Sequence, residues 1–276
     1  MGESIMPVTQ TEKANRFRAL HASGTFVIPN PFDAGSARVL AGLGFEALAT
    51  SSGGFAGTLG RRDGQVTREE ALAHARAVAG AVDVPVSADL ENCFAHAPAE
   101  AAATIPLAAQ TGLVGCSIED ATGDKDRPLY SFDQAVARVT AAVAAARTVG
   151  FPFTLTARTE SFLRGNPNLD DVIKRLQAFE KAGADVLMAP GLPDLASVRA
   201  VCAAVSKPVN FMAGIKGKSF SLAELAECGV RRISLASSLY RAAMTGLIAA
   251  AKEAKEGTFG FIDTSIPTPE LNAFYS

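Results

Sequence analysis

The sequence predicts a single (β/α)8 barrel of the TIM type, on three observations. Short β-branched or apolar runs alternate with Ala-rich helical stretches, which is the pattern of βαβ units around a parallel sheet. Eight such units follow one another without a low-complexity linker or a shift in composition. The 276 residues, of which 48% are apolar, suffice for one large core. Length and composition alone would also suit two small domains.

Each expected strand is short and precedes a helical stretch. The strands are residues 26–28, 47–50, 84–88, 114–118, 153–157, 186–188, 209–212 and 232–235. The helical stretches lie near residues 34–42, 68–82, 98–110, 132–149, 169–182, 194–205, 222–228 and 239–256. We therefore assign residues 1–256 to a catalytic barrel domain and residues 257–276 to a C-terminal extension.

Local signals mark several of these boundaries. Three pairs fit the capping box that satisfies N–H groups at a helix start: Thr67 with Glu70, Ser131 with Gln134, and Ser221 with Glu224. Glycines suited to the left-handed conformation mark helix ends, at Gly42, Gly112, Gly150, Gly183 and Gly229. A Rossmann-like sheet is the structural alternative. It is disfavoured because Pro29-Asn30-Pro31 follows the first strand in place of a G-x-G-x-x-G motif.

The extension at residues 257–276 combines two prolines with several apolar side chains, among them Phe259, Phe261, Leu271 and Phe274. A tail that is free in solution is usually poorer in aromatic residues. We therefore expect the extension to pack on the barrel or on a neighbouring subunit, in preference to being disordered.

Composition excludes several classes of function. The net charge is −2 and the basic residues are scattered, which argues against partners such as nucleic acid or an anionic membrane. The four cysteines form no C-x-x-C pair, so neither a zinc site nor a disulfide framework is expected. No apolar stretch of about 18 residues and no signal peptide is present. The sequence predicts a cytoplasmic protein whose partner is a small molecule or another copy of itself.

Polar residues follow the expected strands at the end of a barrel where reactive groups are usually found. They are Ser51, Ser52, Gly53, Gly54 and Asp63 after the second strand, Asp89, Glu91 and Asn92 after the third, Glu119 and Asp120 after the fourth, Arg158, Thr159 and Glu160 after the fifth, and Asn210 in the seventh. His21, His74 and His96 do not suggest a Ser-His-Asp triad, because only His96 is near a strand end.

Four of these residues predict a metal site. Asp89 and Glu91 are two positions apart, so both carboxylates point to one side if the strand continues through them. With Glu119 and Asp63 they would gather four anions, which repel one another unless a cation lies among them. An all-oxygen set favours Mg2+, with Mn2+ as the alternative. Helix caps or surface ion pairs are the competing interpretation for a lone acid. Three acids placed directly after apolar strands favour the metal.

The same end of the barrel offers groups for an anionic substrate. Arg158 ends the fifth strand, and its planar guanidinium can bind two carboxylate oxygens; an ion pair with Glu160 or Glu119 is the alternative. The turn at residues 51–54 provides hydroxyls and close backbone N–H groups. Lys125 and Arg127 lie on a loop with Gly123 that is either a lid or solvated surface charge.

In order along the chain, these motifs resemble the isocitrate lyase and phosphoenolpyruvate mutase superfamily, in its oxaloacetate decarboxylase-like and carboxyvinyl-carboxyphosphonate phosphorylmutase-like branch. The motifs are Pro29-Asn30-Pro31-Phe32-Asp33-Ala34, Leu59-Gly60-Arg61-Arg62-Asp63, Asp89-Leu90-Glu91-Asn92, Ile118-Glu119-Asp120, Thr156-Ala157-Arg158-Thr159 and Pro208-Val209-Asn210. The second of these is similar to the loop that supplies an outer carboxylate, and the third to the metal pair of the family. The likeness covers nearly the whole chain.

The resemblance implies a barrel whose last helix is exchanged with a neighbouring subunit, in a tetramer built from two swapped dimers. It implies Mg2+ held directly by Asp89, with Asp63, Glu91 and Glu119 acting partly through water. The carboxylate of a 2-oxo or 2-hydroxy acid would rest on Ser51, Ser52, Gly53 and Arg158, with Asn210 also at the substrate. A pyruvate-type enolate would then be stabilised as a C–C or P–C bond opens.

Four departures narrow the reaction. After Glu119 the chain reads Asp120-Ala121-Thr122-Gly123-Asp124-Lys125-Asp126-Arg127-Pro128, without the K-K-C-G-H thiol of the isocitrate and methylisocitrate lyases. Ala189-Pro190-Gly191 replaces the glutamate that those lyases have after strand six, and Cys93-Phe94-Ala95 replaces the usual G-Y-G. Lys125 is only an approximate match to the gating lysine of phosphoenolpyruvate mutase.

The sequence therefore predicts a Mg2+-dependent lyase or decarboxylase acting on a small 2-oxo or 2-hydroxy dicarboxylic acid, with Arg158, Glu119 and Lys125 as its catalytic residues. Two alternatives stay open. One is a phosphonate enzyme of the phosphoenolpyruvate mutase or phosphonopyruvate hydrolase type. The other is a protein that binds 2-oxo acids without converting them.

Overall fold

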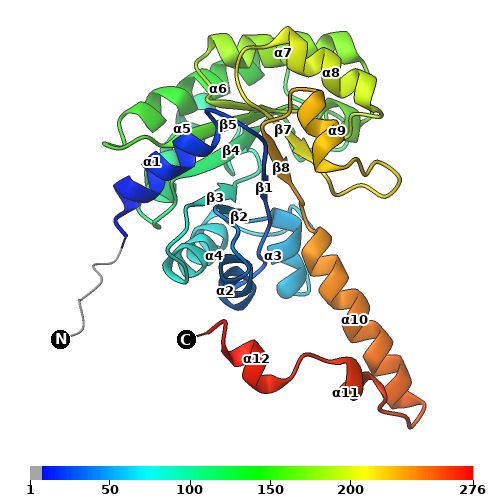
Figure 1. The fold of residues 1–276 in the computed structure, drawn as a ribbon. Coiled ribbons are helices and arrows are strands. Elements are labelled where there is room, and N and C mark those ends of the chain that lie inside the picture. Colours follow the sequence, from blue (N-terminus) through cyan, green and yellow to red (C-terminus); the bar gives the residue numbers. More distant parts are fainter. Residues whose placement is uncertain (1–7, 276) are drawn as a thin grey trace, which may run out of the picture.

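Eight parallel strands form a nearly closed barrel in the computed structural model of the protein, which describes residues 8–275 (Figure 1). The strands are β1 (Phe26–Ile28), β2 (Leu48–Ala49), β3 (Val86–Asp89), β4 (Gly115–Glu119), β5 (Thr154–Arg158), β6 (Val186–Met188), β7 (Val209–Met212) and β8 (Arg232–Ser234). Their hydrogen-bonded order is β1-β8-β7-β6-β5-β4-β3-β2. The predicted barrel is confirmed, and each strand begins and ends within two residues of the bounds that the sequence predicted.

Asn30 connects the two strands at which the barrel closes. Its side-chain N–H donates to the carbonyl of Thr50, and its oxygen accepts from the N–H of Leu235 at 2.7 Å. The N–H of Ala49 donates to the carbonyl of Pro29 beside it. The Pro29-Asn30-Pro31 sequence thus closes the seam between β1 and β2, because its backbone and one amide replace a regular ladder.

Helices lie between successive strands around the outside of the barrel, one more precedes β1, and three follow β8. They are α1 (Gln10–Leu20), α2 (Ala34–Gly42), α3 (Ser52–Thr58), α4 (Arg68–Gly80), α5 (Pro98–Ala109), α6 (Phe132–Arg147), α7 (Leu169–Lys181), α8 (Leu195–Ala204), α9 (Leu222–Glu227), α10 (Ser238–Lys255), α11 (Phe261–Thr264) and α12 (Thr268–Asn272), with a 3-10 helix η1 (Ser161–Arg164). Full capping boxes are present at Thr67 and Ser221, and the Ser131 hydroxyl accepts the N–H of Gln134. α1 and α3 were not predicted.

Helix α1 packs against the barrel at the end opposite the strand termini that carry the acids. A capping box of Thr9 and Glu12 starts it, and Phe17 is fully buried in a small cluster with Ile28 and Val114. The side-chain amide of Gln10 donates to two carbonyls at the end of α5 and in the loop that follows it. A sequence scan for strand–helix units passes over this helix because no strand precedes it.

Alternation along the strands separates an apolar outer face from a polar interior. Ala88, Ile118, Ala157, Phe211 and Ile233 belong to the large core cluster formed with the helices. The residues between them have side chains in the barrel interior, since successive strand side chains point to opposite faces. Those inward residues include Asp89, Ser117, Glu119, Thr156, Arg158, Asn210, Arg232 and Ser234, all of which line one cavity. The alternation of side chains along the strands therefore places the functional groups in the barrel interior.

Helix α10 extends away from the barrel, and the chain returns through α11 and α12 toward α2 (Figure 1). No residue of α10 is buried, and Leu247 and Ile248 are more than half exposed. At the end of the return Phe274 packs on Gly42, where an added Cβ would lie 2.6 Å from the ring, and Arg38 donates to the carbonyl of Tyr275. Within residues 8–275 no helix has the length and apolarity needed to cross a membrane.

Candidate active site

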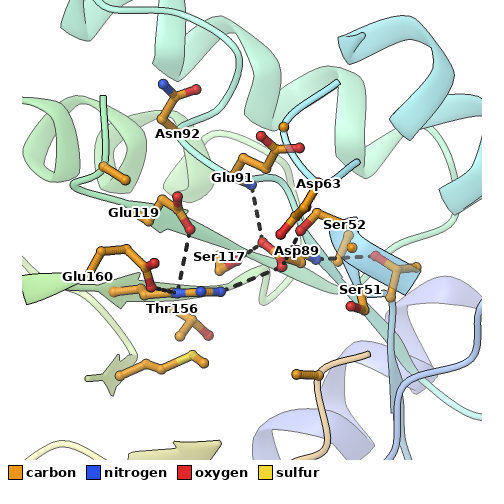
Figure 2. Close-up of a pocket in the computed structure, with 18 of the residues that line it drawn as sticks. Ser51, Ser52, Asp63, Asp89, Glu91, Asn92, Ser117, Glu119, Thr156 and Glu160 are labelled. Atoms are coloured by element: carbon orange, nitrogen blue, oxygen red, sulfur yellow. Dashed lines mark hydrogen bonds and ion pairs between the residues drawn. The ribbon is translucent and has the colours of Figure 1, made fainter. Parts of the chain in front are cut away.

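A cavity of about 1310 Å³ opens at the carboxyl ends of the strands and is lined by residues from most of them. It is lined by the metal candidates Asp63, Asp89, Glu91 and Glu119, the substrate candidates Ser51, Ser52, Gly53, Arg158 and Asn210, and Lys125. Four other residues that the sequence analysis named do not line it: Gly54, Asp120, Arg127 and Thr159. Figure 2 shows the acidic side chains of Asp63, Glu91 and Glu119 gathered around Asp89. The structure thus brings the candidates together at one place.

Asp89, the last residue of β3, is at the centre of this arrangement (Figure 2). One of its oxygens accepts from the hydroxyl of Ser52 at 3.1 Å, and the other from the hydroxyl of Ser117 and the N–H of Glu91. Its own N–H donates to the hydroxyl of Thr50. The carboxylate is therefore held in a fixed position by donors from β4, α3 and its own loop.

The side chain of Glu91 lines the cavity, but it does so from a loop and not from the continued strand that the sequence analysis considered. Strand β3 ends at Asp89, and Glu91 has a φ of 50°, so strand alternation does not orient it. Cys93 and Phe94 also have positive φ, a conformation costly for residues with a side chain. The buried Arg138 supports this loop by donating to the carbonyls of Asn92, Ala95 and His96.

Burial, together with the charges of Asp89 and Asp63, raises the pKa of Glu91 to about 7. Burial and the Asp89 carboxylate likewise raise the pKa of Asp63. Both shifts arise because neighbouring anions at a desolvated site disfavour one another. A cation bound among these carboxylates would favour their charged forms.

Ser51 and Ser52 start a helix, which corrects the expected turn at residues 51–54. Ser51 is the N-cap of α3 and its hydroxyl accepts the N–H of Gly54, while Ser52 is the first helical residue. Asp63 lies against Gly53, where an added Cβ would come within 3.3 Å of its carboxyl group. The hydroxyls and the glycine still face the cavity, now at the end of a short helix.

Arg158 lies among three carboxylates at the end of β5. Its guanidinium is 2.5 Å from Glu160, 3.5 Å from Glu119 and 3.6 Å from Asp89. Burial would lower the pKa of Arg158, but these three anions outweigh it and raise the pKa. Burial raises the pKa of Glu119 well above its ordinary value, even though Arg158 stands beside it. The ion pairs proposed as an alternative role of Arg158 are present, and the residue also lines the cavity.

Asp120 and Lys125 occupy different environments. Asp120 is buried and accepts from the hydroxyl of Thr159, the N–H of Glu160 and Arg175, so it fixes the loop after β5. Lys125 is exposed at the rim of the cavity, on the loop between β4 and α6. Arg127 pairs with Asp124 on the same loop and does not line the cavity.

The donor chemistry of the cavity fits Mg2+. The carboxylates of Asp63, Asp89 and Glu91 provide only oxygen, and a divalent cation would relieve the repulsion that raises two of their pKa values. Across residues 8–275 no three acidic, histidine or cysteine side chains are already spaced to hold one ion. The cavity therefore contains ligand types that suit Mg2+, but their side chains are not in a coordination geometry around one ion.

Several cavity residues escaped the sequence reading. One is Arg164, which lies 4.0 Å from Glu119 and 3.5 Å from Glu160, a residue that the sequence analysis had named after the fifth strand. Thr156 and Arg232 line the cavity deeper inside. Strand alternation was the available signal for the last two, because Thr156 precedes Arg158 by two positions and Arg232 precedes Ser234 by two.

The chain belongs to the phosphoenolpyruvate phosphomutase family, whose profile matches residues 17–255. It is 27% identical to oxaloacetate decarboxylase of Marinomonas sp. over 97% of this chain and 93% of that protein. It is 29% identical to 2,3-dimethylmalate lyase of Eubacterium barkeri, over 94% and 92% of the two chains. These relatives establish an enzyme of the phosphoenolpyruvate mutase and isocitrate lyase superfamily with lyase-type activity, as the motifs predicted.

Solved structures agree in fold. A crystal structure from Burkholderia cenocepacia J2315, which carries only a provisional lyase/mutase designation, is 50% identical with a TM-score of 0.95 and covers 97% of this chain and 96% of its own. A crystal structure of 2,3-dimethylmalate lyase is 27% identical, with a TM-score of 0.86 over 96% and 95% of the two chains. The expected superfamily is therefore confirmed by sequence and by structure.

Proposed function

We propose that the protein is a Mg2+-dependent lyase that cleaves a C–C bond next to the carbonyl or hydroxyl of a small 2-oxo or 2-hydroxy dicarboxylic acid. The observation that carries this proposal is the juxtaposition of the Asp63, Asp89 and Glu91 carboxylates with the Arg158 guanidinium in one cavity. An all-oxygen anionic set suits a hard cation, and a guanidinium suits the carboxylate of the substrate.

Asp89 would hold the metal, with Asp63, Glu91 and Glu119 around it. When bound, Mg2+ supplies a Lewis acid that favours negative charge on a substrate oxygen. Arg158 binds and orients the substrate carboxylate, and Ser52 keeps Asp89 in place through its hydroxyl. Lys125 at the rim excludes water when its loop covers the substrate. For a 2-oxo dicarboxylic acid, the electrons of the broken C–C bond pass to a pyruvate-type enolate as CO2 leaves, and the enolate is then protonated. For a 2-hydroxy acid, the hydroxyl loses its proton and becomes the carbonyl of the 2-oxo product, while the electrons pass to the enolate of the departing carboxylic acid, which is then protonated.

Thiol chemistry of the isocitrate lyase type receives no support from the cysteines. All four are free; Cys93 and Cys116 lie in the core, and burial raises the pKa of Cys93 to about 12. A thiol in such a place stays protonated. None of the four cysteines lies in the loop at residues 120–128 or lines the cavity. Free thiols also suit the reducing cytoplasm in which we place the enzyme.

The test is a screen of oxaloacetate, alkylmalates and phosphonopyruvate with the purified protein, with and without Mg2+. We expect metal-dependent turnover of at least one C–C substrate and its loss on adding a chelator, restored by excess Mg2+ or Mn2+. Phosphorus NMR of the phosphonopyruvate reaction separates the alternative, a phosphonate enzyme, which Lys125 at the cavity rim would favour. Turnover that is unchanged by a chelator, or no turnover of any of these acids, would contradict the proposal.

We further propose that α10 and the extension take part in a homo-oligomer of helix-swapped dimers. Within the described chain α10 buries none of its residues, and Leu247, Ile248, Phe259 and Ile262 expose apolar surface. Such a surface is typical of an interface between subunits. We expect light scattering of the intact protein to give four times the 28.6 kDa of one chain. A monomeric mass at micromolar concentration would contradict this.

A further inference from the structure

Arg232 is a buried arginine inside the barrel, below the acids that surround Asp89. It is the first residue of β8, is 5% exposed, and lines the floor of the cavity together with Thr156, Asn210 and Ser234. Neither the predicted metal ligands nor the predicted substrate groups include it. A buried cation normally has an acidic partner, because an unpaired charge is costly away from water.

Arg232 has neutral partners instead. Its Nε donates to the Asn210 oxygen at 2.8 Å, one Nη donates to the Thr156 hydroxyl at 2.9 Å, and the other lies 3.4 Å from Nε2 of His21. Among residues 8–275 no carboxylate oxygen lies within 4.0 Å of it. Burial and the Arg232 charge lower the pKa of His21 to about 3, so the imidazole is neutral and leaves the arginine charge uncompensated.

These contacts determine which way the Asn210 amide faces. A guanidinium has N–H donors and no acceptor, so only the oxygen of Asn210 can lie against Nε of Arg232. The amide nitrogen therefore points the other way, where one of its hydrogens is donated to the hydroxyl of Ser234 at 3.0 Å. Asn210 is 1% exposed and is one of the residues that line the cavity, and within residues 8–275 its second N–H makes no hydrogen bond.

We propose that Arg232 is a positioning residue that fixes the Asn210 amide with its NH2 group toward the cavity, so that Asn210 donates to a carboxylate oxygen of the substrate. Without Arg232 the amide would be free to turn and present its oxygen, which repels a carboxylate. This inference rests on the proposed function in that the ligand is a small carboxylate anion. It adds a role for Arg232, which determines the orientation in which the Asn210 amide contacts this anion.

The test compares oxalate binding to the full-length protein and its variants by calorimetry in the presence of Mg2+. We expect Arg232→Met to weaken oxalate binding by about 30-fold, the loss of a well-oriented bond to a charged group. We expect Arg232→Lys to weaken it by about 10-fold, because an ammonium keeps the charge but cannot hold all three partners at once. KM for the substrate should rise in parallel while kcat changes little.

Two controls separate positioning from stability and from charge. Leu176→Ala removes a fully buried side chain of α7 that belongs to the core cluster and does not line the cavity, and should lower stability without changing oxalate affinity. In an Asn210→Ala background, Arg232→Met should weaken oxalate by no more than about threefold further, since the two residues act as one unit. Full additivity of the two substitutions, or wild-type affinity in Arg232→Lys, would overturn the proposal.

The proposal can also be judged if the wild-type protein neither binds oxalate nor converts any of the acids, an outcome that would defeat the proposed function alone. The side-chain amide of Asn210 can then be observed by NMR with 15N-asparagine, and assigned with Asn210→Ala. We expect slow hydrogen exchange of this NH2 group in the wild-type protein and at least tenfold faster exchange in Arg232→Met. An amide signal with unchanged exchange in Arg232→Met would overturn the positioning role.

Discussion

Replacing Asp89 with alanine is expected to lower kcat/KM by about 1000-fold or more while leaving the fold intact. Asp89 is the carboxylate on which the metal proposal depends most, because Ser52, Ser117 and the backbone of Glu91 all hold it in place. Its removal also relieves the repulsion that raises the pKa values of Asp63 and Glu91. Steady-state kinetics with Mg2+ and thermal unfolding measure the two effects.

Two control variants test the role of Asp89: one keeps the shape of its side chain without the charge, and the other removes an acid outside the cavity. Asp89→Asn retains the shape and can still accept from Ser52, so its activity should fall nearly as far with less change in stability. Asp83→Ala removes an acid that is 77% exposed and only 3.8 Å from Lys13, and should leave kinetics unchanged. Unfolding of Asp89→Ala at room temperature, with Asp89→Asn fully active, would show that the residue is structural.

The strand period explains why the barrel and most of the site were predictable. In parallel strands that are buried on both faces, apolar runs mark the strands and the next polar residue marks the carboxyl end. Asp89, Glu119 and Arg158 all lie at such ends and all line the cavity. These residues could be placed together without coordinates because the fold brings all strand ends to one side.

The parts that escaped prediction depend on local backbone geometry or on contacts distant in sequence. The Ser51–Gly54 sequence resembles a turn, but in the structure Ser51 caps helix α3, and this short helix contacts Asp63 and Asp89. Glu91 has a positive φ, and the loop that follows it is supported by Arg138, which is 46 residues away from Asn92 in the sequence. In the sequence Arg232 is a charged residue at the start of a strand, which is usually exposed. Because it is two positions before Ser234, strand alternation places its side chain inside the barrel.

Arg158→Lys is expected to raise KM by about 100-fold, the largest effect after that of Asp89→Ala. A lysine keeps the charge near Glu119 and Glu160 but loses the planar pair of donors that fits a carboxylate. Arg158→Met should in addition lose about 3–5 kcal/mol of stability, since three carboxylates would then share a buried site without their main cation. Kinetics with the substrate found in the screen and chemical denaturation measure these changes.

Arg147 provides the matched control for Arg158. It binds Asp185 through two nitrogens at 2.7 and 3.0 Å, a geometry as specific as that proposed for Arg158 with substrate, and it does not line the cavity. Arg147→Lys should therefore cost a little stability and leave KM unchanged. If Arg158→Lys behaved in the same way, its guanidinium would serve only to neutralise Glu119 and Glu160, and substrate binding would have to depend on Asn210 and the metal.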